Sequence, residues 1–211
     1  MVQTPSSTAA IVGRFAWILI GAIAGIGIQA LLGRVFRPTI TPDVELLPIF
    51  AKNVDTARLF MVSGKPLVGD LVENAVFYFV RLRYTGWRSE VECDLPQIYQ
   101  KGKKQRLLPL GTTFWNGYPE ARRTIQRSAS RSEFCVCMLD QDQGVIRLWH
   151  SSRNRWIKSP EGEGTRAEIV IAPTSSGARV RSRLLELTSP QVGKATKLEV
   201  SSWAEVAGSW G

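Results

Sequence analysis

The chain lacks the residues and loops on which most enzyme active sites are built. Its 211 residues include a single histidine, His150. It has no Gly-x-Ser-x-Gly elbow, no Gly-x-x-x-x-Gly-Lys-Ser/Thr loop and no Gly-x-Gly-x-x-Gly fingerprint, so the local signatures of serine hydrolases, P-loop proteins and dinucleotide-binding enzymes are all missing. We therefore expect a non-enzymatic protein without a cofactor. An enzyme with no recognisable motif is the third interpretation, and no residue can be assigned to it.

The chain also lacks the usual marks of an exported domain. Its three cysteines, Cys93, Cys135 and Cys137, are an odd number and provide no disulfide framework. No Asn-x-Ser/Thr acceptor for glycosylation occurs anywhere in the sequence. Domains in oxidising compartments usually show disulfides. Both absences favour a reducing compartment for the soluble part of the chain.

The cysteines allow one sharper hypothesis. A hairpin that is symmetric about Asp142 places His150 beside Cys135, and Cys135 and Cys137 then share one strand face. Together with Cys93 they compose a set of three thiolates and one imidazole, which zinc accepts. The competing interpretation is three buried free thiols, because Cys-x-Cys is not the usual knuckle spacing and Cys93 lies 42 residues before Cys135. We favour the second interpretation and predict no metal.

What the sequence does contain is one uncharged apolar run at residues 15–33. As a helix it spans about 29 Å, close to the hydrocarbon thickness of a bilayer. Arginines flank the run at both ends: Arg14 precedes it, and Arg34 and Arg37 follow it. The run predicts a short polar N-terminus at 1–14 and a single transmembrane helix at 15–36. The alternatives are a cleaved signal peptide, whose apolar core is usually about 7–15 residues, and a buried core helix.

Two features predict the surroundings of this segment. Gly21 and Gly25 lie four residues apart, a spacing at which two helix backbones can approach closely. We expect a homodimer contact or another membrane helix there. The trailing flank carries more basic residues than the leading flank, which favours the soluble domain on the cytoplasmic side, or on its stromal or matrix equivalent.

The remainder of the chain predicts a single β-rich domain. Residues 37–53 contain three prolines and are interpreted as a connector, which leaves 54–211 as the basic soluble domain. Alternation with a period of two dominates, and turn residues recur about every ten positions. The pattern predicts a mainly β fold, a sandwich or barrel, with about seven or eight short strands and one short helical stretch at 118–131.

Residues 76–84 are the clearest strand. Its even positions are all apolar or aromatic, whereas its odd positions change from Phe77 and Phe79 to Arg81 and Arg83. One face is therefore expected to be buried along the whole strand. The other face is expected to change from buried to solvent-exposed along the strand. The remaining strand candidates are 56–62, 87–95, 133–139, 145–150, 167–172, 178–187 and 196–203.

The net charge of +9 is concentrated in the middle of the soluble domain. Residues 101–166 hold 13 Lys/Arg and 6 Asp/Glu, a local net charge of +7. The predicted strand at 178–187 adds three arginines at alternate positions, which would share one face. The candidate residues for binding an anionic partner are Lys101, Lys103, Lys104, Arg106, Arg122, Arg123, Arg179, Arg181 and Arg183.

These features favour a single-pass, membrane-anchored accessory or scaffold protein. Its basic domain would bind an acidic protein partner or an anionic lipid surface, with the anchor raising the local concentration of a weak binding surface. The alternative is a membrane-associated nucleic-acid-binding protein, such as a viral one, in which Trp149 or Trp156 stacks on bases. Salt-dependent binding to nucleic acid would distinguish the alternative from the first interpretation.

Overall fold

A computed structural model describes residues 21–28, 38–55, 71–86, 88–101, 107–117, 120–127, 132–150, 153, 155–159, 166–189 and 198–205. The chain divides into two units, Met1–Arg37 and Pro38–Gly211. The described part of the first unit is a helix at residues 21–28. Over the described ranges, no helix is long and apolar enough to cross a membrane. The second unit is mainly β, which confirms that part of the predicted fold class.

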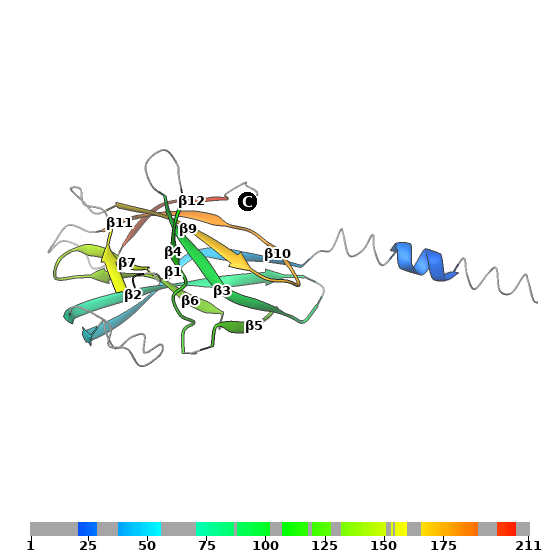
Figure 1. The fold of residues 1–211 in the computed structure, drawn as a ribbon, viewed down its shortest axis with the longest axis horizontal. Coiled ribbons are helices and arrows are strands. Elements are labelled where there is room, and N and C mark those ends of the chain that lie inside the picture. Colours follow the sequence, from blue (N-terminus) through cyan, green and yellow to red (C-terminus); the bar gives the residue numbers. More distant parts are fainter. Residues whose placement is uncertain are drawn as a thin grey trace, which may run out of the picture. The chain divides into compact units, whose positions relative to one another are not determined.

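Within the described residues the second unit contains twelve strands (Figure 1). They are β1 (Thr39–Asp55), β2 (Leu71–Thr85), β3 (Glu90–Lys101), β4 (Leu107–Gly111), β5 (Arg122–Gln126), β6 (Glu133–Asp140), β7 (Val145–His150), β8 (Arg155–Lys158), β9 (Arg166–Thr174), β10 (Arg179–Val180), β11 (Arg183–Thr188) and β12 (Glu199–Glu205). The count exceeds the seven or eight predicted. The predicted strand at 56–62 lies outside the described residues.

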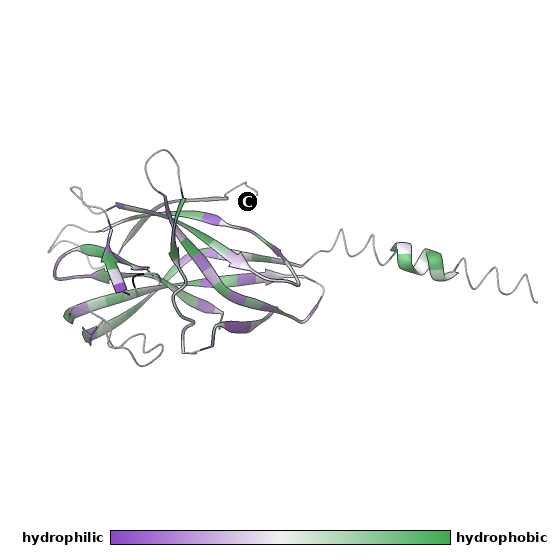
Figure 2. Ribbon diagram, in the orientation of Figure 1, coloured by the Kyte–Doolittle hydropathy of each residue, from purple (hydrophilic) through white to green (hydrophobic). Residues whose placement is uncertain are grey.

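The strands form two sheets. Sheet A has the order β10-β1-β2-β6-β7-β8, and sheet B has the order β12-β11-β9-β3-β4, with β5 also paired to β3. The predicted hairpin is present, because β6 and β7 pair antiparallel around the turn at 141–144. Figure 2 shows the alternation of hydrophilic and hydrophobic residues along these strands.

The main core lies between the two sheets and uses the even face of β2. This cluster includes all the even-numbered residues of the segment: Val76, Tyr78, Val80, Leu82 and Tyr84. The prediction that this face is buried is therefore confirmed. The hydroxyl oxygen of Tyr78 accepts a hydrogen bond from the backbone N–H of Leu198 at 2.9 Å, next to the start of β12. Burial raises the pKa of Tyr78. The tyrosine therefore crosses the core and links the two sheets.

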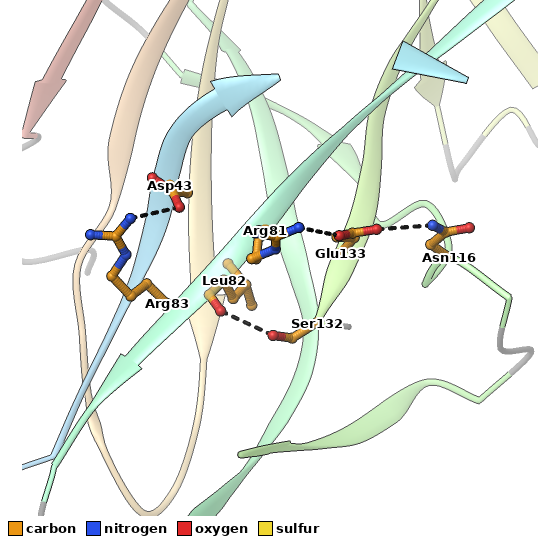
Figure 3. A network of polar contacts seen from close by, with 7 residues as sticks. All are labelled: Asp43, Arg81, Leu82, Arg83, Asn116, Ser132 and Glu133. Carbon is orange, nitrogen blue, oxygen red and sulfur yellow. Dashed lines mark hydrogen bonds and ion pairs between the residues drawn. The ribbon is translucent and has the colours of Figure 1, made fainter. Parts of the chain in front are cut away.

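The face of β2 formed by its odd-numbered residues changes from buried to solvent-exposed along the strand, as predicted. Phe77 and Phe79 belong to a second cluster on the outer side of sheet A, where Phe114 packs edge-on against both rings. Farther along the strand, Arg81 pairs with Glu133 at 2.8 Å and Arg83 pairs with Asp43 at 2.9 Å. Figure 3 shows these pairs, with Asn116 donating to the other oxygen of Glu133.

The interpretation of 37–53 as a connector is wrong, because most of these residues form β1. This strand pairs with β2 from Thr39 to Pro42 and again from Leu46 to Asp55, despite containing Pro42 and Pro48. Beyond Ile40, none of the described residues pairs with its other side. Proline has no N–H to donate, and edge strands tolerate it for that reason. A shift in register between Pro42 and Leu46 also separates the first part of β1 from the rest.

The predicted helical stretch at 118–131 is also wrong, since its central residues form β5. This strand pairs antiparallel with β3, from Glu90 opposite Gln126 to Asp94 opposite Arg122. Ile125 enters the main core from β5. Burial of this side chain against the opposite sheet outweighs a local preference for helix.

Candidate functional site

Two of the central basic residues predicted to bind an anion, Lys101 and Arg122, lie beside acidic residues. Arg122 lies 2.7 Å from Asp94 and 3.6 Å from Glu92. The hydrogen bond with Asp94 and the charge of that carboxylate raise the pKa of Arg122. Lys101 lies 3.7 Å from Glu168. Arg123 has its own interactions and is half-buried. Three further candidates lie outside the described residues: Lys103, Lys104 and Arg106.

The outer face of sheet B therefore carries charges that compensate one another. Glu168 lies opposite Glu186 in the β9–β11 register. Each has a basic neighbour, because Lys101 contacts Glu168 and Arg166 contacts Glu186 at 3.0 Å. Exposed cross-strand pairs of this kind contribute about 0.2–1 kcal/mol each. Such compensated charges are typical of a solvent-exposed sheet surface.

The three alternating arginines do not share a face, which corrects the prediction of one strand at 178–187. Arg179 belongs to β10 in sheet A, whereas Arg183 begins β11 in sheet B. The chain changes sheets between them, with Ser182 buried at the crossing. Arg179 and Arg181 are exposed, and Arg183 is half-buried.

The candidate zinc ligands are not brought together. Cys93 lies on sheet B, while Cys135 and Cys137 lie on β6 of sheet A. A register shift in the β2–β6 pairing leaves Cys135 in the outer cluster and Cys137 in the main core. The two therefore face opposite sides of the sheet, contrary to the prediction. Among the described residues, no group of three or more His, Cys, Asp or Glu is arranged to hold a metal.

The three thiols are buried and form no disulfide. Burial raises the pKa of Cys93 to about 12. It raises the pKa of Cys135 and of Cys137 as well. Because the thiolate is the reactive form, these cysteines are inert at neutral pH.

The tryptophans proposed for base stacking are buried. Trp149 and Trp156 pack edge-on at 5.7 Å in the outer cluster of sheet A, and Trp156 also contacts Phe77. Trp115 lies in the main core against Phe134. An aromatic ring must present an open face to stack on a base. The nucleic-acid interpretation loses the aromatic residues on which it depended.

Four of the exposed arginines lie near one end of the second unit. We call this the basic end: Arg88, Arg127, Arg179 and Arg181, with Glu90 as the acidic residue among them. All five side chains are exposed. Their formal charges give a net charge of +3. Arginine remains charged at any physiological pH.

Backbone pairing fixes two of these arginines beside the first residues of the second unit. β10 pairs parallel with the start of β1, with Arg179 opposite Thr39. The N–H of Arg179 donates to the carbonyl of Pro38 at 2.7 Å, and the N–H of Arg181 donates to the carbonyl of Ile40 at 2.9 Å. Both arginines therefore lie where β1 begins.

The loop after β2 brings the other two arginines to the same end. Thr85 lies opposite Thr39. A Cβ on Gly86 would lie 2.7 Å from the Cβ of Pro38, so only glycine allows this close approach. Arg127 is held to the same loop by its N–H, which donates to the carbonyl of Ser89 at 2.9 Å.

Sequence reasoning named Arg179 and Arg181 but missed Arg88 and Arg127. Their proximity depends on pairing between residues up to 140 positions apart in the sequence, from Thr39 to Arg179. One local signal was available for Arg88, which lies two residues after Gly86. Glycine at the end of a strand pattern marks a turn, and turns lie at the protein surface.

The arginines of the basic end can bind an anion. Guanidinium groups donate up to five hydrogen bonds to carboxylate or phosphate oxygens and cannot act as a base. The described residues at this end include no histidine or cysteine. The arrangement therefore favours a binding surface. The chain matches no model of a known protein family, no curated protein and no solved structure.

Proposed function

We propose that the chain is a single-pass membrane protein whose β-rich domain acts as a non-enzymatic accessory or scaffold at the membrane surface. The anchor is the apolar segment 15–36, and the domain lies on the cytoplasmic side or its stromal or matrix equivalent. The observation that supports this proposal is the exposed apolar helix at residues 21–28. Its isoleucines are largely uncovered, with Ile23 63%, Ile26 68% and Ile28 59% exposed.

Water is a poor environment for such a helix. Exposed apolar surface costs about 25 cal/mol per Å², so three uncovered isoleucines favour a partner that covers them. Apart from the helix itself, none of the described residues lies within 4 Å of a Cβ placed at Gly21 or Gly25, so these glycines leave the helix uncovered on their side as well. Nineteen uncharged residues around the helix supply the length that a bilayer core requires.

The proposal is tested by extracting membranes that contain the full chain with alkaline carbonate. We expect the chain to stay in the membrane pellet. The double substitution Ile23→Arg/Ile26→Arg should release it, because each arginine at mid-helix costs about 2.5–3.5 kcal/mol on insertion.

A matched control places the same charges in the domain. Val44 and Leu108 are exposed apolar side chains of the second unit, at 52% and 53%. The double substitution Val44→Arg/Leu108→Arg should leave the chain in the pellet. Release of the unsubstituted chain by carbonate contradicts the proposal.

A further inference from the structure

We infer that the basic end binds the anionic lipid headgroups of the membrane in which the chain is anchored. This inference rests on the proposed function and names the partner of its domain. The surface consists of Arg88, Arg127, Arg179 and Arg181. It was not predicted from the central basic cluster of the sequence.

The first argument is the covalent reach of the chain. The apolar run ends at Gly33 and the second unit begins at Pro38. Five residues span at most about 18 Å when fully extended. The headgroup layer occupies roughly 5–7 Å of that distance on each side of a bilayer. The start of β1, and the arginines paired beside it, therefore stay close to the headgroups.

The second argument is the charge that the basic end presents. Four exposed arginines and one exposed glutamate give +3 at the point nearest the proposed anchor. Surface potentials decay over about 8 Å at physiological ionic strength, so they still act on a surface held within one or two such lengths. Arg34 and Arg37 add positive charge in the intervening chain. Basic segments next to a membrane helix are typical sites for anionic lipid.

The third argument is the balanced charge at the opposite end of sheet A, which we call the far end. There β1 ends, β2 begins and the turn at 141–144 connects β6 to β7. Lys52 and Lys158 lie at this end with Asp55, Glu73 and Asp142, and the connecting segment 56–70 contains Arg58, Lys65 and Asp70, so the formal charges sum to zero. A negative membrane surface therefore attracts the basic end and not the far end.

An acidic protein surface is the competing partner, and the observations favour lipid over it. The residues predicted for a protein partner were those of the central cluster, where Lys101 and Arg122 already contact acidic neighbours. The basic end lies instead where the anchor would hold it against lipid continuously. A tethered surface of this kind needs little intrinsic affinity.

The test uses the full chain in lipid nanodiscs and measures energy transfer to a headgroup acceptor. The donor dye is attached to Ser176→Cys, an exposed position in the loop before Arg179. The three native cysteines are buried and do not compete for the dye. We expect a higher docked fraction in discs with 30% phosphatidylserine than in phosphatidylcholine alone.

The triple substitution Arg88→Gln/Arg179→Gln/Arg181→Gln should remove this lipid dependence. Each lost arginine lowers the ratio of docked to undocked domain about fivefold. The matched control is Arg153→Gln/Arg155→Gln/Lys158→Gln, which removes the same charge from exposed positions elsewhere and should retain the dependence.

Three results would overturn the inference. The first is an equal docked fraction in both lipids, and the second is equal loss in both triple variants. The third is an acidic protein that co-purifies with the native chain and is lost with the basic-end variant, which would assign the surface to a protein. Each of these leaves the proposed function intact if carbonate still fails to extract the chain, so the two failures are distinguishable.

Discussion

The two ends of sheet A use charge in opposite ways. At the basic end the arginines are exposed, and the backbone N–H groups of Arg179 and Arg181 donate to the carbonyls of Pro38 and Ile40. At the far end Asp140 and Arg147 are buried and paired at 2.7 Å, with side chains only 3% exposed. Above them, Asp142 accepts two hydrogen bonds from Asn74. Charge at the far end therefore stabilises the fold, whereas charge at the basic end remains accessible to a partner.

The largest expected effect is at the buried pair of the far end. Arg147→Ala leaves the Asp140 carboxylate buried without its cation, and we expect a loss of about 3–5 kcal/mol in the free energy of unfolding. Denaturant titration of the reconstituted chain measures it. Arg155→Ala, at an exposed position on β8, is the control and should change stability by less than about 0.5 kcal/mol. Equal effects of the two substitutions would contradict the contrast between the ends.

The next effect is at the junction that forms the basic end. Gly86→Ala places a Cβ 2.7 Å from both the Pro38 Cβ and the Tyr84 hydroxyl, which the packed strands cannot easily relieve. We expect a loss of about 1–3 kcal/mol in unfolding free energy. Gly177→Ala, whose Cβ would lie 3.3 Å from Val91, should cost less. If the order were reversed, the close approach of Pro38 to the loop after β2 would be wrong.

Alkaline pH should weaken the fold without discharging the basic end. Cys93 titrates near 9 when unfolded and at about 12 when buried, so the unfolded chain loses its proton first. Stability is complete below pH 9 and falls as the pH rises toward 12. Cys93→Ala should flatten the slope of stability against pH by up to about 1.4 kcal/mol per pH unit. An unchanged slope between pH 9 and 11 would show that the thiol is not buried.

The smallest expected effect is on the outer face of sheet B. Arg166→Gln removes the pair with Glu186, which is largely solvated on the arginine side. We expect a loss below about 1 kcal/mol, decreasing further with added salt. Thermal unfolding at low and high salt measures it. A loss as large as that of Arg147→Ala would mean that this face is covered in the native protein.

Local patterns in the sequence were sufficient for strands that lie inside a sheet. The alternation at 76–84 predicted both faces of β2, because neighbours on each side enforce burial at every second residue. The predicted strand at 145–150 coincides with β7. In these segments the period of hydrophobicity and the final burial have the same cause.

The errors arose where long-range pairing overrides a local signal. Pro42 and Pro48 indicated a connector, but a strand at the edge of a sheet accepts proline, and the edge is known only once the neighbours are placed. The bulge that separates Cys135 from Cys137 depends on the register with β2. Arg88 was missed for the same reason, since it lies near Arg179 only because the loop after β2 and the start of β10 both approach Pro38.

The central claim is that the basic end faces the membrane and the far end faces away from it. It is tested most directly by comparing energy transfer from a dye at Ser176→Cys with that from a dye at Gln143→Cys, an exposed position in the turn at 141–144, in the same phosphatidylserine nanodiscs. We predict strong transfer to headgroup acceptors from position 176 and weak transfer from position 143. Equal transfer from both positions, or stronger transfer from position 143, would contradict this orientation.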